Sequence, residues 1–298
     1  MAKSVYEIVT ERILEKLEEG TVPWHKPWAG GGCPKNLVSG KAYRGVNVLL
    51  LGSQDFTSPY WVTFKQAKQL GGCVRKGEKG TPCIFWKFLN RDTEDAVTGE
   101  TESLKIPLVR YYSVFNAVEQ CDGISHPRLE AQAEEPTPFN PIEAAEAIVA
   151  SYPDAPSIAQ DGRASAYYRP STDSIHTPKR ETFDSEAHYY ATLFHEMTHS
   201  SGHEFRLGRP GVMNPTRYGS HEYSQEELVA EMGAAFLLAE AGIDSDSLTD
   251  NSAAYVASWL KALKNDPKLV VLAGAQAQKA VDHITGREFE ATLEAKAA

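Results

Sequence analysis

The segment Tyr189–His199 contains the pattern H-E-x-x-H, which restricts the fold more than any other feature of the chain. Four residues on an α-helix advance the chain by about 6 Å and turn it about 40° past a full turn, so His195 and His199 point to the same side. Two neutral imidazoles held in this way suit a tetrahedral Zn²⁺ ion, with room for a third protein ligand and a water molecule. The apolar neighbours Leu193 and Phe194 indicate that the helix is buried, as a rigid metal site requires.

Glu196 follows the first histidine and is the predicted catalytic base. A metal ion lowers the pKa of a water molecule, and a neighbouring carboxylate can take the proton, which leaves hydroxide for attack on a carbonyl. A structural zinc site needs no such base and usually has four protein ligands, so Glu196 favours catalysis over a structural role. Zn²⁺ is the expected cofactor, with another divalent ion such as Mn²⁺ as the alternative. Asp184 or Ser185 is expected to cap the start of the helix.

The third metal ligand is expected to come from a second helix. The pattern continues as H-E-x-x-H-x-x-G, which begins like that of a metzincin, but Phe205 stands where the third histidine of that class would fall. The segment Glu227–Glu231 is instead similar to the E-x-x-A-D/N segment of gluzincin-like and phage-type metallopeptidases, whose first carboxylate binds the metal. On this resemblance Glu227 is the predicted ligand, and Glu231 is expected to accept a hydrogen bond from a ligand imidazole.

Other arrangements of the site stay open at this stage. Ser224 and Glu227 also have the spacing of a capping box, which would tie the Glu227 carboxylate to the backbone. The first alternative for the third ligand is Glu231, and the remaining candidates are His203, His221 and Glu226.

Charge is distributed unevenly along the chain. Residues 1–90 hold 13 Lys and Arg against 7 Asp and Glu, a net charge of +6, whereas the whole chain has a net charge of −10. The sequence therefore predicts a basic N-terminal module on an acidic body, and a basic module favours phosphate-bearing partners.

Aromatic residues alternate with basic ones between Trp24 and Phe88. Binders of single-stranded nucleic acid need both kinds, because positive charge follows the backbone while rings stack on unpaired bases. The sequence has no zinc-finger spacing and no continuously basic helix, so reading of duplex sequence is not expected. The alternative is that Trp24, Trp61 and Trp86 belong to the core and the lysines only solvate the surface. The predicted DNA contacts are Tyr43, Arg44, Trp61, Lys65, Lys68, Arg75, Lys76, Lys79 and Lys87, with Tyr43 and Trp61 as the stacking rings.

The segment 125–141 contains four prolines and little that could be buried, so it is the predicted linker. It divides the chain into residues 1–124, a small α+β DNA-binding domain that is expected to fold alone as a fragment of residues 1–125, and residues 142–298, a mostly helical domain with a small sheet. The fold class is thus α+β with two domains. Apolar periodicity predicts helices at residues 4–19, 64–70, 142–151, 185–201, 225–241, 251–264 and 268–284, and strands at residues 82–89, 104–115, 166–169 and 174–177.

The sequence also indicates a compartment. No apolar stretch approaches the roughly 20 residues that span a bilayer, and the first residues lead into a charged amphipathic segment rather than a secretory signal. The four cysteines include no C-x-x-C pair and are expected to be free thiols. We therefore expect a cytoplasmic protein without a membrane partner.

Both halves resemble one known family, the ArdC-type antirestriction proteins of plasmids, whose N-terminal domain also occurs at the front of TraC-type plasmid primases. The resemblance covers nearly the whole chain except the linker. The segments that resemble the N-terminal domain are Tyr43–Leu50, Tyr60–Ala67, Gly71–Gly80 and Tyr112–Asn116, and those that resemble the zincin-like domain are Tyr189–His203, Glu227–Leu238 and Ser258–Lys264.

The resemblance implies a plasmid- or phage-encoded protein that binds single-stranded DNA and protects DNA entering a recipient cell, as in conjugation, against type I or type II restriction. It also implies a metallopeptidase fold like that of the DNA-repair protease Spartan. Two alternatives stay open: a DNA-binding antirestriction protein whose metal is structural and whose peptidase is inactive, and a stand-alone peptidase whose basic module binds a protein. The protein substrate is unknown at this stage.

Overall fold

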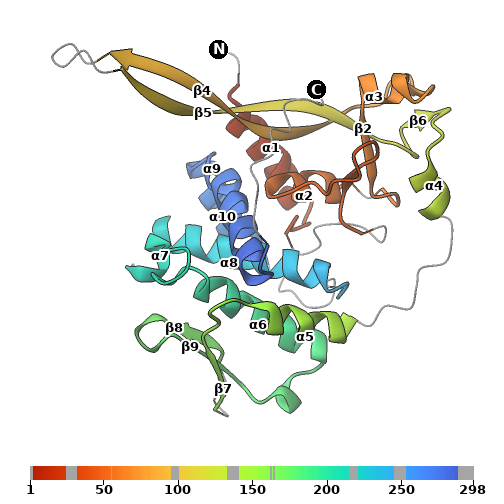
Figure 1. The fold of residues 1–298 in the computed structure, drawn as a ribbon. Coiled ribbons are helices and arrows are strands. Elements are labelled where there is room, and N and C mark those ends of the chain that lie inside the picture. Colours follow the sequence, from red (N-terminus) through yellow and green to blue (C-terminus); the bar gives the residue numbers. More distant parts are fainter. Residues whose placement is uncertain are drawn as a thin grey trace.

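The computed structural model combines helices and three sheets, which confirms the expected α+β class (Figure 1). The structure describes residues 3–24, 32–54, 56–94, 101–132, 141–161, 163, 165–214, 221–244 and 253–287. Within these ranges, side chains are not described for residues 87–94, 101–107, 131–132, 141, 221–223 and 253.

The N-terminal half is built on a four-stranded sheet with the strand order β1-β2-β5-β4. Strands β4 and β5 pair antiparallel from Thr81↔Val114 to Glu94↔Thr101 and form a long ribbon that extends past the rest of the molecule (Figure 1). A two-stranded sheet of β3 and β6 lies beside α3. The elements are α1 (Val5–Glu18), β1 (Lys35–Asn36), α2 (Val46–Gly52), β2 (Tyr60–Thr63), α3 (Phe64–Gln69), β3 (Cys73–Val74), β4 (Thr81–Glu94), β5 (Thr101–Asn116) and β6 (Cys121–Asp122).

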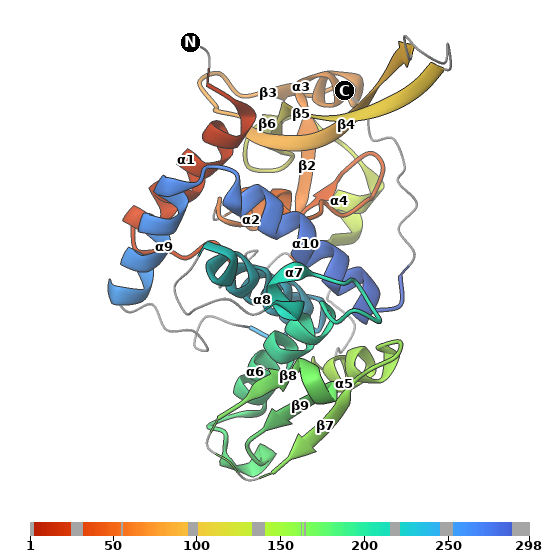
Figure 2. The same cartoon turned by 90° about the vertical axis from the view of Figure 1, so that its left-hand side faces the viewer.

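The C-terminal half places a three-stranded sheet beside a group of helices (Figure 2). Its central strand, β9, pairs parallel with β7 and antiparallel with β8. The predicted strands and helices are present, but α8 begins four residues earlier than predicted. Strand β7 was missed because it is only four residues long, has the sequence SIAQ without an apolar alternation, and is mostly exposed. The elements are α5 (Pro141–Ser151), β7 (Ser157–Gln160), β8 (Tyr167–Arg169), β9 (Ser174–Thr177), α6 (Glu186–Ser200), α7 (Pro210–Met213), α8 (His221–Glu240), α9 (Ala253–Asn265) and α10 (Leu269–Ile284), with short 3-10 turns at Pro170–Thr172 and Arg180–Thr182.

Helix α1 begins at a capping box, as its sequence indicates. The backbone N–H of Glu7 donates to the Ser4 hydroxyl at 3.3 Å, and the Ser4 N–H donates to the Glu7 carboxylate at 2.6 Å. The buried face of the helix packs against α9 and α10, and the Thr10 hydroxyl donates to the carbonyl of Pro267 at 2.7 Å. Within the described residues, the first helix is therefore packed against the last two.

One hydrophobic core runs through both halves of the molecule. Trp24 donates from its indole nitrogen to the Tyr255 hydroxyl at 3.3 Å, and its ring packs edge-on against Trp259 at 5.6 Å. A Cβ atom on Gly274 would lie 2.9 Å from the backbone nitrogen of Val46, so α10 approaches α2 as closely as only glycine allows. The shared core includes Val9, Ile13, Leu17, Val48, Leu49 and Leu50 from the N-terminal half and Leu228, Met232, Leu263, Val270, Ala277 and Val281 from the C-terminal half.

This packing bears on the expected domains. The division into residues 1–124 and 142–298 stays a prediction, but the expectation that residues 1–125 fold alone does not fit a core that the C-terminal helices complete. The linker prediction needs a correction as well, because Pro127–Gln132 forms the helix α4. Arg128 donates to the carbonyls of Leu37 at 2.7 Å and Val38 at 2.9 Å, which fixes α4 to the N-terminal half. Residues 133–140 of the predicted linker lie outside the described residues.

Two sequence expectations concern the compartment. Within the described part of the chain, none of the helices combines the length and the apolar character that a bilayer span requires. Cys33, Cys73, Cys83 and Cys121 are free thiols in the structure.

The shared core predicts that the two halves unfold together. Ile13 is 1% exposed, so Ile13→Ala should lower the free energy of unfolding by about 2–5 kcal/mol. Hydrogen exchange should report this loss in both β2 and α8. The control is Leu272→Ala on α10, where the side chain is 36% exposed and a smaller loss is expected. A loss confined to the N-terminal half would contradict the shared core.

Candidate metal centre

Helix α6 holds the two histidines of the H-E-x-x-H pattern. Ser185 caps the helix, since its hydroxyl accepts a hydrogen bond from the His188 N–H at 3.3 Å, which selects one of the two predicted caps. The face opposite the histidines is anchored in the core by the buried residues Tyr190, Leu193 and Phe194. The two ligand candidates therefore stand on a rigid element.

Helix α8 crosses α6 at a glycine. A Cβ atom on Gly233 would lie 2.5 Å from Cγ2 of Thr198, so the two backbones could not approach as closely with any other residue there. This crossing brings the first turns of α8 alongside the histidines, and with them Glu227.

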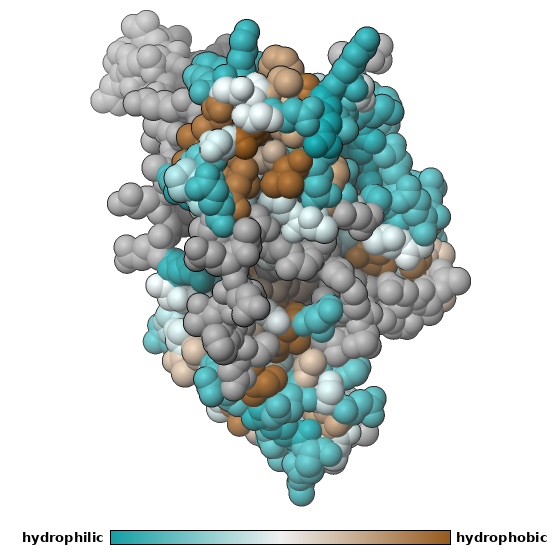
Figure 3. All heavy atoms as spheres, turned by 90° about the vertical axis from the view of Figure 1, so that its right-hand side faces the viewer, coloured by the Kyte–Doolittle hydropathy of each residue, from teal (hydrophilic) through white to brown (hydrophobic). Residues whose placement is uncertain are grey.

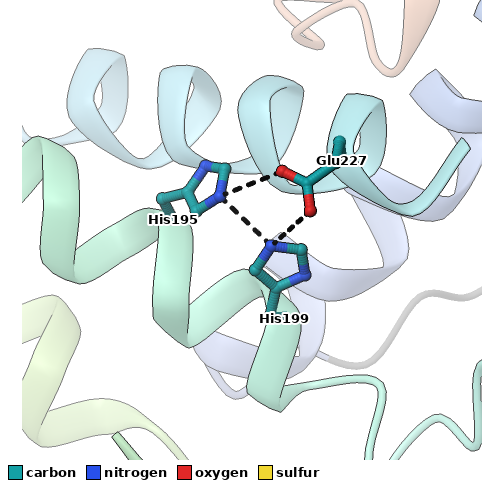
Figure 4. A group of neighbouring side chains, drawn as sticks. All are labelled: His195, His199 and Glu227. Atoms are coloured by element: carbon teal, nitrogen blue, oxygen red, sulfur yellow. Dashed lines mark hydrogen bonds and ion pairs between the residues drawn. The ribbon is translucent and has the colours of Figure 1, made fainter. Parts of the chain in front are cut away.

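His195, His199 and Glu227 converge on one point (Figure 4). The two Nε2 atoms lie 3.1 Å apart, and each lies 3.7 Å from a Glu227 carboxylate oxygen. In the part of the chain that the structure describes, these three form the one group of His, Cys, Asp or Glu side chains with ligand atoms within 4.8 Å of one another.

The donor set fits a divalent ion. Two nitrogens that bind a tetrahedral ion at about 2.0–2.1 Å are about 3.3 Å apart, close to the separation seen here. Burial, followed by the neighbouring His199, lowers the pKa of His195 to about 3, which keeps its imidazole in the neutral form that binds metal. Two nitrogens and a carboxylate oxygen around one point also leave room for a water molecule.

Glu196 lies on the same helix, α6, and its side chain contacts the small sheet. It is 8% exposed, and burial raises the pKa of its carboxyl above the ordinary value. The backbone N–H of Tyr168, on the edge strand β8, donates to this carboxylate and favours its ionised form. A carboxylate with a raised pKa is a stronger base, which suits proton transfer from water.

Glu226, and not Glu231, contacts a ligand imidazole. The Glu226 carboxylate lies 3.2 Å from Nδ1 of His199. Glu231 instead accepts a hydrogen bond from Tyr255, and burial raises the pKa of its carboxyl to about 7. The expectation for Glu231 is therefore corrected. The prediction chose Glu231 because it lies four residues after Glu227, in the pattern of the related metallopeptidases. In the structure, the residue directly before Glu227 contacts the imidazole instead.

The remaining alternatives for the site can be located as well. Ser224 lies inside α8, which begins at His221, so it does not hold the position before the helix that a capping box requires. His203 is buried behind α6, with its ring 4.8 Å from that of Phe205, and does not belong to the converging group. The side chain of His221 lies outside the described residues.

The predicted stacking rings are in the core. Trp61 is 1% exposed and Tyr43 6%, and both pack in a cluster with Leu51, Cys83 and Val114. A base cannot reach either ring, so their predicted stacking role is corrected. The alternative interpretation was right for Trp24 and Trp61, while Trp86 stays partly exposed.

The predicted basic DNA contacts differ in whether their side chains are paired with acidic residues or exposed. Arg44 pairs with Asp282 of α10, and Arg75 donates to Asp122 at 2.8 Å. The side chain of Lys87 is outside the described part of the chain. The exposed lysines of the prediction are Lys65, Lys68, Lys76 and Lys79. Phe64 and Tyr111 are exposed rings of the N-terminal half that the sequence did not single out.

Comparison with known proteins agrees with this organisation. Residues 3–115 match the family model for the N-terminal domain of the anti-restriction factor ArdC, and residues 143–276 match that of a zincin-like metallopeptidase. The chain is similar to the crystal structures of the antirestriction protein ArdC from the R388 plasmid, with a TM-score of 0.72 and 39% identity to the metal-free structure over 96% of this chain and 100% of that one. The Mn(II)-bound structure matches with the same TM-score and identity, over 95% and 98%.

Two curated relatives extend the comparison. DNA primase TraC of Escherichia coli is 41% identical over 96% of this chain, which spans only 27% of the primase. The protein y4eC of Sinorhizobium fredii is 35% identical over 96% of this chain and 93% of its own length.

Fold and site together define a two-part protein, in which an ArdC-type N-terminal half precedes a zincin-like domain with a candidate site for a divalent metal. The chain belongs to the ArdC family of antirestriction proteins. The expected family is thereby confirmed.

Metal binding by the purified protein tests the three ligands. We expect about one divalent ion per chain, and loss of the ion in His195→Ala and in His199→Ala. Glu227→Ala should weaken binding more than Glu231→Ala, because Glu227 lies 3.7 Å from both Nε2 atoms. Metal titration with a competing chelator measures the order, and full stoichiometry in both histidine variants would exclude the site.

The buried carboxyl of Glu231 should make stability depend on pH. Its pKa is about 7 in the folded state against 4.5 as the ordinary value, so the folded state holds its proton more tightly. The resulting stabilisation is fully present below about pH 4.5 and is lost as the pH rises to about 7. Glu231→Gln should therefore gain stability relative to the parent above pH 4.5, by at most about 3 kcal/mol at pH 8. Urea unfolding of the metal-free proteins at pH 4 and pH 8 measures the difference in the free energy of unfolding between Glu231→Gln and the parent. The same difference at both pH values would contradict the prediction.

Proposed function

We propose that the protein is a plasmid- or phage-encoded antirestriction protein that acts in the cytoplasm. It binds single-stranded DNA, carries a metal-dependent peptidase site, and protects DNA that enters a recipient cell. The observation that carries the peptidase part is the convergence of His195, His199 and Glu227 beside Glu196. The relatives support the DNA part, since one is named as a DNA primase and another as an antirestriction protein.

In this proposal His195, His199 and Glu227 hold the ion, with Zn²⁺ as the expected metal and Mn²⁺ as the alternative suggested by the Mn(II)-bound ArdC structure. A bound divalent ion would lower the pKa of a water molecule and polarise a peptide carbonyl. Glu196 takes the proton from the attacking water and passes it to the leaving amine. Its burial supports this role, because water around the carboxylate would weaken it as a base.

The surface around α3 is the best-supported place for single-stranded DNA. Phe64 is 61% exposed at the first position of α3, next to Lys65 and one turn from Lys68. Lys76 and Lys79 are exposed near the neighbouring β3. We call Phe64, Lys65, Lys68, Lys76 and Lys79 the α3 surface.

The α3 surface has the two features that binding of unpaired bases requires. An exposed ring gives a stacking platform, and the lysines can follow the phosphates. The only acidic side chain between Lys76 and Lys79 is Glu78, which accepts a hydrogen bond from Gln120 at 3.0 Å. Figure 3 shows the side of the molecule on which α3, β6 and α4 lie, where hydrophobic side chains gather among hydrophilic ones. The stacking role thus moves from the buried Tyr43 and Trp61 to Phe64.

Binding of single-stranded DNA by the full chain tests this surface. Phe64→Ala should weaken binding by about 1–3 kcal/mol at every salt concentration, because it removes a stacking contact. Lys65→Gln and Lys68→Gln should each lower the slope of log affinity against log salt by about 0.7. Phe205→Ala is the matched control, because that ring is 77% exposed in the other half of the molecule. Unchanged binding by Phe64→Ala, or equal affinity for duplex, would contradict the proposal.

Peptidase activity is tested by incubating the metal-loaded protein with and without single-stranded DNA and following cleavage of the protein itself and of candidate partners. Glu196→Gln should retain the metal and lose cleavage, since the amide cannot take a proton from water. Cleavage that persists in Glu196→Gln would exclude Glu196 as the base. Absence of cleavage in the metal-loaded parent would favour the alternative in which the metal is structural.

A further inference from the structure

Arg209 forms a buried two-bond pair with Glu226. Arg209 is the residue before α7 and is 5% exposed; its Nε donates to one Glu226 carboxylate oxygen at 3.0 Å and its terminal nitrogen donates to the other at 2.7 Å. Two parallel bonds of this kind fix the plane of the carboxylate as well as its position.

The same carboxylate contacts His199. Its Oε1 lies 3.2 Å from Nδ1 of the imidazole, whose Nε2 faces His195 and Glu227. Glu226 thus lies between the guanidinium of Arg209 and the candidate metal ligand His199.

Arg209 is itself bound to the end of α6. It donates to the Ser201 hydroxyl at 2.7 Å and to the carbonyl of Thr198 at 2.6 Å, and these residues flank His199 in the chain. The guanidinium therefore links the last turn of α6 to the first turns of α8.

Two glycines allow this close arrangement. A Cβ atom on Gly202 would lie 3.0 Å from the guanidinium carbon of Arg209, and one on Gly211 would lie 2.9 Å from Cβ of Glu226. A side chain at either position would displace one partner of the pair. The Arg209–Glu226 pair thus depends on Gly202 before Arg209 and on Gly211 after it.

We propose that Arg209 and Glu226 are positioning residues of the metal centre, which hold the His199 ring with its Nδ1–H toward Glu226 and its Nε2 lone pair toward the ion. The inference rests on the proposed metal site. A carboxylate that accepts from the far nitrogen of a ligand imidazole selects its tautomer and raises its basicity. Arginine is required because lysine cannot bind both carboxylate oxygens in one plane.

Histidine side-chain nitrogen NMR of the metal-free protein tests the tautomer directly. The parent should show His199 with the proton on Nδ1, whereas Glu226→Gln and Arg209→Lys should show a mixture of tautomers. In a chelator competition with Zn²⁺, both variants should bind about 10–100-fold more weakly than the parent.

The control is Arg206→Lys. The Arg206 side chain is 1% exposed, pairs with Asp173 and donates to the carbonyl of Ser200 on α6, but it contacts none of the three ligands. This variant should keep both the His199 tautomer and the zinc affinity.

Unchanged tautomer and affinity in folded Arg209→Lys and Glu226→Gln would overturn the proposal. If Glu226→Gln does not fold, Arg209→Lys decides alone, because it leaves Glu226 in place. A parent that binds no zinc would refute the proposed metal site, and the tautomer measurement would still decide the role of the pair because it needs no metal.

Discussion

The close crossing of α6 and α8 is the constraint on which the site depends. Gly233 lets the backbones meet over Thr198, where a Cβ atom would lie 2.5 Å from the threonine methyl. Two turns earlier on α8, Glu227 then reaches the two imidazoles and Glu226 reaches the back of His199. A larger residue at the crossing would separate the helices, and the ligand and the orienting carboxylate would both move away from the histidines.

The same helix α8 connects the site to the N-terminal half. Besides α6, helix α8 packs against α10. Glu231 of α8 accepts a hydrogen bond from Tyr255 of α9, and the Tyr255 hydroxyl accepts one from the indole N–H of Trp24. Residues before position 125 thus complete the packing around the helix that carries Glu227. The N-terminal half therefore carries the α3 surface and also supports the metal centre. This support comes from the shared core, not from the α3 surface.

Local patterns predicted much of this molecule, and tertiary contacts decided the rest. The spacing of His195 and His199 fixed their common direction, because a helix has one geometry. The choice between Glu226 and Glu231 required the angle at which α8 crosses α6, which the sequence does not contain. Tyr43 and Trp61 were misjudged because basic residues nearby in the sequence indicate a surface, whereas tertiary packing buries both rings in one cluster with Leu51, Cys83 and Val114. Arg209 could not be recognised from its neighbours, since its partners lie on two other segments.

X-ray diffraction measured at the zinc and manganese absorption edges, on crystals grown with each ion, tests the central claim most directly. The account predicts one strong anomalous peak per chain, about 2.0–2.1 Å from Nε2 of His195 and of His199 and about 2.0–2.2 Å from a Glu227 oxygen. Glu226 should lie outside the coordination sphere, on Nδ1 of His199. An ion bound by Glu226 or Glu231, or a peak away from the two imidazoles, would contradict it.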